Sequence, residues 1–152
     1  YERMIEACDF LRGHEVGETV AVIGGGLTGS EIAYELALQG KKPLIVEMKD
    51  DLISQKGVCL ANSSYLREWF ALHQVPVYLE TALKEVRPGE IVCTDKSGAE
   101  LTIPCDSVIS CAGYIPAPLT AKGGRVHFVG DCRAVGNLRS VIWNAYETAM
   151  KI

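Results

Sequence analysis

The amino-acid sequence predicts an α/β fold of three layers, with a parallel central sheet and a small antiparallel β-meander. Three observations predict it. Short apolar, β-branched runs alternate with segments of helical periodicity over residues 19–79. A cluster of three glycines separates the first of these strands from the helix that follows it. Residues 82–104 then change to period-two alternation, which is typical of antiparallel strands.

The first half of the chain is predicted to alternate helices and strands. Residues 2–12 have the apolar spacing of a helix, which ends at Gly13. The next segments predict a buried strand, a helix that ends at Gly40 and a second buried strand, at residues 19–23, 28–39 and 43–47. A strand, a glycine turn, a helix and a strand in this order make a βαβ unit, whose crossover is expected to be right-handed. Residues 48–58, which come next, are polar and irregular.

Beyond this unit the pattern indicates one more helix and one more parallel strand. Residues 60–74 predict a helix with Asn62 or Ser63 as its N-cap. Residues 75–79 predict the third strand of the parallel sheet. Because proline cannot donate to a sheet ladder, Pro76 indicates that pairing starts after it or that this strand lies at an edge.

The second half of the chain begins with the antiparallel meander. Its three strands, separated by turns that contain Gly89 and Gly98, are predicted at residues 82–87, 90–95 and 99–104. Residues 106–112 return to an apolar strand that ends at Gly113, and a loop is expected over residues 114–124. A further strand and a final helix, with Asn137 as its cap, are predicted at residues 126–129 and 137–151.

The composition is that of an ordinary globular protein, and the length suits one domain or one domain with part of a second. It has 152 residues, 48% hydrophobic and 22% charged, with a net charge of −4 and a pI of about 5.4. The sequence has no basic stripe and no apolar run of about 20 residues, so neither nucleic acid nor a membrane is an expected partner. No signal peptide is recognisable, which predicts a cytoplasmic protein.

Six cysteines are spread along the sequence without a CxxC pair, so no metal ligands are predicted in this chain. Cys93, Cys105 and Cys111 lie in or beside predicted strands. We therefore expect buried free thiols in a reducing compartment, in preference to disulfides.

The pattern Gly24-x-Gly26-x-x-Gly29 lies directly after a buried strand and opens a helix, the context that a dinucleotide-binding turn requires. Gly24 allows a tight turn, and Gly26 lets the backbone approach a pyrophosphate. Gly29 lets the helix pack close to the strand. The N–H groups and positive dipole end of that helix favour a phosphate. A Rossmann-like dinucleotide-binding fold is therefore predicted, and the alternative is a tight turn without a ligand.

Glu47 ends the second strand, where a carboxylate can accept the ribose hydroxyls of the adenosine. A carboxylate there also repels the 2′-phosphate of NADP, so NAD(H) is favoured over NADP(H), although Lys49 softens that preference. The following Met48 is predicted to belong to the same cofactor site. The alternative for Glu47 is a solvated carboxylate at a strand end.

Three motifs resemble those of two-dinucleotide flavoproteins of the disulfide-reductase-like class. The segment 24–31, GGGLTGSE, resembles their nicotinamide-domain fingerprint and includes Leu27 and Thr28. The resemblance implies that Glu31 lies near the nicotinamide, whereas its position alone is equally explained by favourable helix electrostatics. The segment 110–116, with Ala112 and Gly113, resembles the strand-to-loop motif that leads back to the FAD domain.

The third motif, residues 126–132, resembles the flavin motif of the same class. There the resemblance implies that Asp131, after Gly130, hydrogen-bonds the ribityl chain of FAD. Two longer segments, 31–48 and 129–152, resemble the C-terminal part of bacterial NADH:flavin oxidoreductases of the old-yellow-enzyme type, which include 2-enoate and 2,4-dienoyl-CoA reductases.

This resemblance implies a fragment of a larger flavin-dependent oxidoreductase. Residues 14–113 are expected to form an NAD(P)-binding Rossmann-like domain, and residues 1–13 and 114–152 to resemble part of an FAD-binding domain. FAD is expected in the parent protein, and FMN and an iron–sulfur cluster are expected there without being bound by this chain. The expected partners are the FAD and barrel domains of the parent, with a homodimer of the fragment as a further expectation.

In the parent enzyme the resemblance implies hydride transfer from NADH to flavin and reduction of an activated C=C bond. No catalytic side chain is assigned, because the cofactors carry this chemistry. Two alternatives remain open at this point. One is a stand-alone, non-catalytic module that senses NADH, and the other is a methyltransferase-like domain that binds S-adenosylmethionine. The antiparallel meander and the Gly130-Asp131 pair argue against the second alternative.

Overall fold

A computed structural model describes residues 4–54, 57–118 and 126–152. The chain divides into two compact units, Tyr1–Ala112 and Gly113–Ile152. Among the described residues, no helix is long and apolar enough to cross a membrane.

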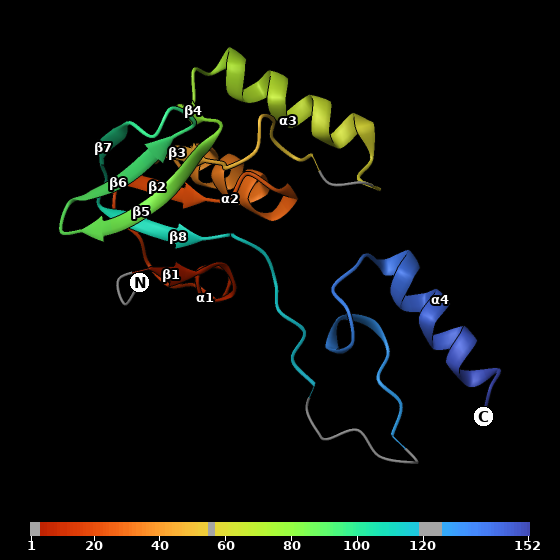
Figure 1. Cartoon of the computed structure of the whole chain (residues 1–152). Coiled ribbons are helices and arrows are strands. Elements are labelled where there is room, and N and C mark those ends of the chain that lie inside the picture. Colours follow the sequence, from red (N-terminus) through yellow and green to blue (C-terminus); the bar gives the residue numbers. More distant parts are fainter. Residues whose placement is uncertain (1–3, 55–56, 119–125) are drawn as a thin grey trace. The chain divides into compact units, whose positions relative to one another are not determined.

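The first unit contains a parallel sheet of five strands in the order β1-β8-β2-β3-β4 (Figure 1). In chain order these strands are β1 (Ile5–Glu6), β2 (Thr19–Ile23), β3 (Lys42–Val46), β4 (Val77–Tyr78) and β8 (Ser107–Ser110). Three helices connect them, namely α1 (Ala7–Leu11), α2 (Leu27–Leu38) and α3 (Leu60–Leu72). A second, antiparallel sheet is formed by β5 (Thr81–Arg87), β6 (Glu90–Asp95) and β7 (Glu100–Pro104).

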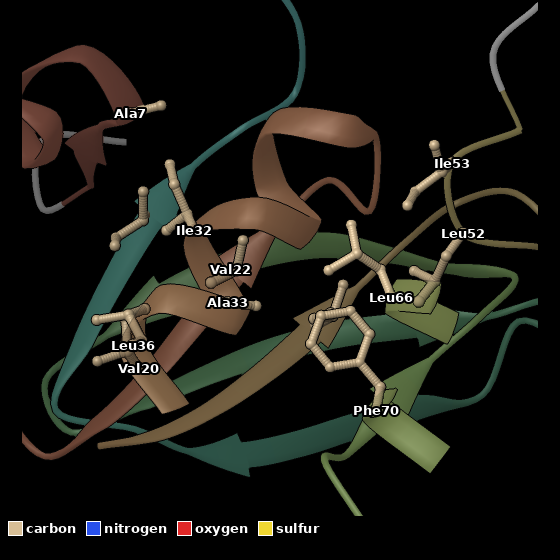
Figure 2. Packing of buried hydrophobic residues seen from close by; sticks show 12 residues of the cluster. Ala7, Val20, Val22, Ile32, Ala33, Leu36, Leu52, Ile53, Leu66 and Phe70 are labelled. Carbon is tan, nitrogen blue, oxygen red and sulfur yellow. The ribbon is translucent and has the colours of Figure 1, made fainter. Parts of the chain in front are cut away.

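The two faces of the parallel sheet bury two separate cores. Because successive side chains of a strand point to opposite faces, Val20 and Val22 of β2 pack with the helices, while Ala21 and Ile23 pack with the antiparallel sheet. Figure 2 shows the helix-side core, which joins residues of α2 and α3 to β2. The protein therefore has a helical layer, a parallel sheet and an antiparallel sheet, and the predicted three-layer α/β fold is confirmed.

Several sequence predictions are confirmed within one or two residues. The central helix, its flanking strands and all three meander strands are present. Gly40 has a left-handed φ of 81°, as a glycine that ends a helix commonly does. The strand after Pro76 is short and lies at the edge of the parallel sheet, which agrees with both expectations drawn from that proline.

Other predictions are wrong. The N-terminal segment forms a short helix preceded by strand β1, which pairs with β8, so its helical spacing describes only residues 7–11. Helix α3 begins at Leu60 and its N-cap residue is Cys59, not Asn62 or Ser63, which lie inside the helix. Ser63 is instead buried, and its hydroxyl donates to the carbonyl of Leu60 at 3.1 Å.

The second unit contains a 3₁₀ turn, η1 (Gly130–Cys132), and helix α4 (Leu138–Ala149). Asn137 caps α4 as predicted, because its side chain accepts the N–H of Ser140 at 3.0 Å. The predicted strand at 126–129 is not formed: Val126 makes an isolated bridge and residues 127–129 have no regular structure. Apolar side chains of α4, such as Ile142 and Trp143, are exposed on this unit. The homodimer that was expected for the fragment stays a prediction.

Candidate functional site

The register of the parallel sheet brings the glycine turn and Glu47 together. Ile23, the last residue of β2, pairs with Val46 of β3 and with Ser110 of β8. The residues that follow these three strands therefore meet at the carboxyl edge of the sheet, where open α/β sheets bind their ligands. The N–H of Gly24 donates to the carbonyl of Val46 at 2.8 Å, which fixes the start of the turn beside Glu47.

Two glycines of the turn lie too close to neighbouring backbone for any side chain. Gly24 has a φ of 105°, and a Cβ there would collide with the carbonyl oxygen of Cys111. A Cβ on Gly29 would collide with the carbonyl oxygen of Gly24. The first turn of α2 is thereby pressed against the strand ends, which is the packing role that the sequence pattern assigns to the third glycine.

Helix α2 opens at this turn, with Gly26 as its N-cap residue and Leu27 and Thr28 in its first turn. The first helical hydrogen bond runs from the N–H of Ser30 to the carbonyl of Gly26 at 2.9 Å. The N–H groups of Thr28 and Gly29 precede it and have no acceptor within the helix. The positive end of the helix dipole lies at the same place, so an anion is favoured there.

Glu47 is half-buried and its carboxylate is directed at the turn. Its Oε2 accepts the N–H of Gly25 at 2.6 Å, and its Oε1 accepts the N–H of Lys49 at 2.8 Å. The carboxylate is therefore fixed between the glycine turn and the loop after β3. These bonds do not fit a freely solvated strand-end carboxylate, and contact of Glu47 with a ligand stays a prediction.

The loop after β3 contributes residues that sequence reasoning missed. Leu52 and Ile53 are only 4% and 3% exposed, and the N–H of Ile53 donates to the carbonyl of Gly25 at 2.8 Å. Ile53 has a φ of 51°, a conformation that costs a β-branched residue on the order of 1–3 kcal/mol. Arg67 of α3 binds this loop at Asp51 and at the carbonyl of Leu52. The apolar pair Leu52-Ile53 in a polar segment was the signal that could have indicated a buried loop.

Cys111 packs against the glycine turn, since it lies beside both Gly24 and Gly29. Burial raises the pKa of its thiol to about 12, and the charge of Glu6 adds to the shift. Burial likewise raises the pKa of Cys105 to about 11. These thiols stay protonated near neutral pH and serve packing, whereas Cys8 and Cys59 are exposed, contrary to the general expectation of buried thiols.

The remaining predicted site residues are more dispersed. Glu31 is exposed on α2, and Met48 is 73% exposed beside Glu47. Ala112 follows β8 at the end of the first unit, whereas Gly113 begins the second. Gly130 and Asp131 also belong to the second unit, where Asp131 Oδ1 accepts the N–H of Gly136 at 3.1 Å. The structure thus brings the glycine turn, Glu47 and Ala112 into one unit, and it describes no common site for Gly130 and Asp131 with them.

A glycine turn of this geometry, opening a helix beside a strand-end carboxylate, defines a dinucleotide-binding α/β protein. A family model described as pyridine nucleotide-disulphide oxidoreductase matches residues 1–137. The chain belongs to this family, and membership implies binding of FAD and of a pyridine nucleotide.

Two curated relatives resemble this chain at above 30% identity. Cinnamate reductase of Clostridium sporogenes is 34% identical over 144 residues, which is 90% of this chain and 21% of the relative. Bilirubin reductase of Mediterraneibacter gnavus is 32% identical over 118 residues, which is 74% of this chain and 18% of the relative. The chain thus spans about a fifth of the length of these relatives.

The fold recurs in solved structures, of which two cover nearly the whole chain. A 2-naphthoyl-CoA reductase has a TM-score of 0.86 at 24% identity, over 99% of this chain and 24% of the other. Histamine dehydrogenase from Rhizobium sp. 4-9 has a TM-score of 0.80 at 16% identity, over 98% of this chain and 26% of the other. At these identities the likeness establishes the fold alone.

Proposed function

We propose that this chain is the nicotinamide-dinucleotide-binding part of a flavin-dependent oxidoreductase, and that its cofactor is NAD(H). The observation that carries the proposal is the Glu47 carboxylate, held 2.6 Å from the N–H of Gly25 at the start of α2. A phosphate-binding helix start and a carboxylate beside it provide for the two ends of an ADP group, namely the pyrophosphate and the adenosine ribose.

The residues present fit this cofactor. Gly24 and Gly29 lie where a Cβ would meet backbone, so the turn packs closely between the strand end and α2. The N–H groups of Thr28 and Gly29 donate to the phosphates. Glu47 accepts hydrogen bonds from the ribose hydroxyls, because the bonds from Gly25 and Lys49 leave other lone pairs of its carboxylate available. A bound reduced nicotinamide would supply a hydride to a flavin of the parent protein and leave as NAD+. The chain itself binds and orients, and Glu31 of α2 is the carboxylate proposed to lie near the nicotinamide.

The parent enzyme is proposed to reduce an activated C=C bond, such as that of a 2-enoate or a dienoyl-CoA. The name of the relative cinnamate reductase supports this class of substrate, because cinnamate carries a conjugated C=C bond. FAD, and also FMN and an iron–sulfur cluster, are proposed for the parent, with its FAD and barrel domains as partners in the cytoplasm. Residues 14–113 are proposed as the NAD(P)-binding domain, although the described part of 1–13 packs in the same unit.

The isolated chain is expected to bind NADH about fivefold or more tightly than NADPH. A 2′-phosphate about 4 Å from the Glu47 carboxylate costs roughly 1–4 kcal/mol, and about 1.4 kcal/mol corresponds to a factor of ten in affinity. Glu47→Gln removes the charge and keeps an oxygen acceptor for Gly25, so it should bring the two affinities to within about threefold. Fluorescence titration of both nucleotides measures the ratio, and S-adenosylmethionine serves as a third ligand.

Glu35→Gln is the matched control, because Glu35 is an exposed carboxylate of α2 that accepts a hydrogen bond from Gln39 in its own helix. This variant should keep the wild-type ratio of affinities. Tighter binding of NADPH than of NADH by the wild-type chain would contradict the role given to Glu47. Preferential binding of S-adenosylmethionine would refute the proposed function and favour the methyltransferase-like alternative.

A stand-alone module that senses NADH is the second candidate function. It shares the same binding site and differs in having no flavin to reduce. The gene sequence around residues 1–152 distinguishes the two, because a barrel domain and a second GxGxxG motif in the same polypeptide are expected only for the oxidoreductase.

A further inference from the structure

Arg67 of α3 joins that helix to the loop of residues 48–54, which lies against the glycine turn. We propose that Arg67 is a positioning residue for the adenosine end of the dinucleotide site, and that it acts through this loop on Gly25 and Glu47. The inference rests on the proposed function, since it assigns a further residue to the same site.

The 48–54 loop holds both polar groups of the Gly25 peptide in place. The carbonyl of Gly25 accepts the N–H of Ile53 at 2.8 Å, while its N–H donates to Glu47. A Cβ on Gly25 would collide with the Leu52 side chain, so the loop also packs directly on the turn. At the start of the loop, the N–H of Lys49 donates a hydrogen bond to Glu47 Oε1 at 2.8 Å. The position of the carboxylate therefore depends on the path of this loop.

That path is not one that the loop would prefer by itself. Ile53 is held in the left-handed region, with a φ of 51°, which is unfavourable for a β-branched residue. Such a conformation persists only where the surrounding structure over-determines it. Burial of Leu52 and Ile53 in the helix-side core is one such constraint (Figure 2). The polar constraint comes from Arg67.

The Arg67 guanidinium makes a forked contact with consecutive residues of the loop. Its Nε donates to Asp51 Oδ1 and to the carbonyl of Leu52, both at 3.0 Å. Its Nη2 lies 2.9 Å from Asp51 Oδ2 and donates to the same carbonyl at 2.5 Å. The planar fork of arginine suits this combination, and the single ammonium of lysine does not reproduce it. The Arg67 side chain is 30% exposed and that of Asp51 is 52% exposed, so solvent screens the ion pair and the bonds to the Leu52 carbonyl matter most.

Arg67 is itself carried by a firmly anchored helix. Its neighbour Leu66 is 6% exposed, and Phe70, one turn further along α3, is 1% exposed. Figure 2 shows both side chains in the same cluster as Leu52 and Ile53 of the loop. The core thus fixes α3, Arg67 of α3 fixes the loop, and the loop fixes Gly25 and Glu47.

The test is a titration of the 152-residue chain with NADH and with NADPH, for the wild type, Arg67→Leu, Arg67→Lys and Asp51→Asn. Arg67→Leu should weaken NADH binding about tenfold and NADPH binding much less, so that the ratio of the two affinities falls. The reason is that a displaced Glu47 carboxylate no longer distinguishes the ribose of NADH, which has a 2′-hydroxyl, from that of NADPH, which has a 2′-phosphate. Arg67→Lys should give an intermediate ratio, since it keeps the charge and loses the fork.

Circular dichroism and thermal unfolding accompany each titration. If Arg67→Leu does not fold, Asp51→Asn provides the test, because it keeps the bonds of Arg67 to Leu52; it should weaken NADH binding about threefold and lower the ratio. Arg87→Gln is the control, since Arg87 pairs with Glu85 on the antiparallel sheet, and it should change neither affinity.

An unchanged NADH affinity in folded Arg67→Leu would overturn the inference. Equal losses for NADH and NADPH would also overturn it, because they would reduce Arg67 to a general contribution to stability. Failure of the wild-type chain to bind NADH would instead refute the proposed function, and the two failures are therefore distinguishable.

Discussion

Gly29→Ala is expected to lower the affinity for NADH at least a hundredfold and to lower the free energy of unfolding by about 1–3 kcal/mol. The added Cβ would collide with the carbonyl oxygen of Gly24 and lie 3.1 Å from the Cβ of Cys111. Both neighbours are fixed by the strand ends, so the first turn of α2 must move away from them. The N–H groups that are proposed to bind the phosphates move with it. Isothermal titration and urea denaturation measure the two effects.

The sign of the stability change makes this prediction decisive. In an ordinary helix, replacement of glycine by alanine stabilises by roughly 1 kcal/mol, so propensity and steric contact predict opposite results. Gly40→Ala, just beyond the other end of α2, is the control. A Cβ at Gly40 has open space but a strained φ of 81°, so this variant should lose about 1 kcal/mol and keep wild-type NADH affinity. A more stable Gly29→Ala that still binds NADH would show that the turn is not closely packed.

The sequence was sufficient for the fold because its signals are local. The βαβ unit follows from an apolar run, a glycine cluster and a helical period, each readable within about 12 residues. The meander follows from period two and from turn glycines, and Gly89 and Gly98 indeed have positive φ. Strand order is less local, yet the closeness of Glu47 to the turn was predictable, since parallel neighbours end at one edge.

The parts that failed depend on features that residue type alone does not determine. Asn62 and Ser63 are good caps by residue type, but α3 starts earlier, and Ser63 bonds its own helix. Residues 126–129 have strand-like composition, yet a strand needs a neighbour with which to pair. Arg67 could not be assigned a role from sequence, because its partner Asp51 lies 16 residues away in a segment without periodicity.

Phe70→Ala is expected to lower the free energy of unfolding of the first unit by about 3–5 kcal/mol. Phe70 is 1% exposed and packs in the core that holds α2 and α3 on the parallel sheet. A cavity at this point loses buried apolar surface and leaves the core unable to collapse fully around it. Since the whole stability of a domain is about 5–15 kcal/mol, this single change removes a large fraction of it.

The measurement is urea denaturation followed by the fluorescence of Trp69, which lies beside Phe70 with ring centroids 5.8 Å apart. A Trp143→Phe background removes the signal of the second unit, so that Trp69 reports the first unit alone. Leu72→Ala is the control on the same helix, because Leu72 is 77% exposed and its loss should change stability by no more than about 0.5 kcal/mol. Similar effects of the two variants would mean that α3 is not anchored through Phe70. The path from the core through Arg67 to the dinucleotide site would then have lost its first step.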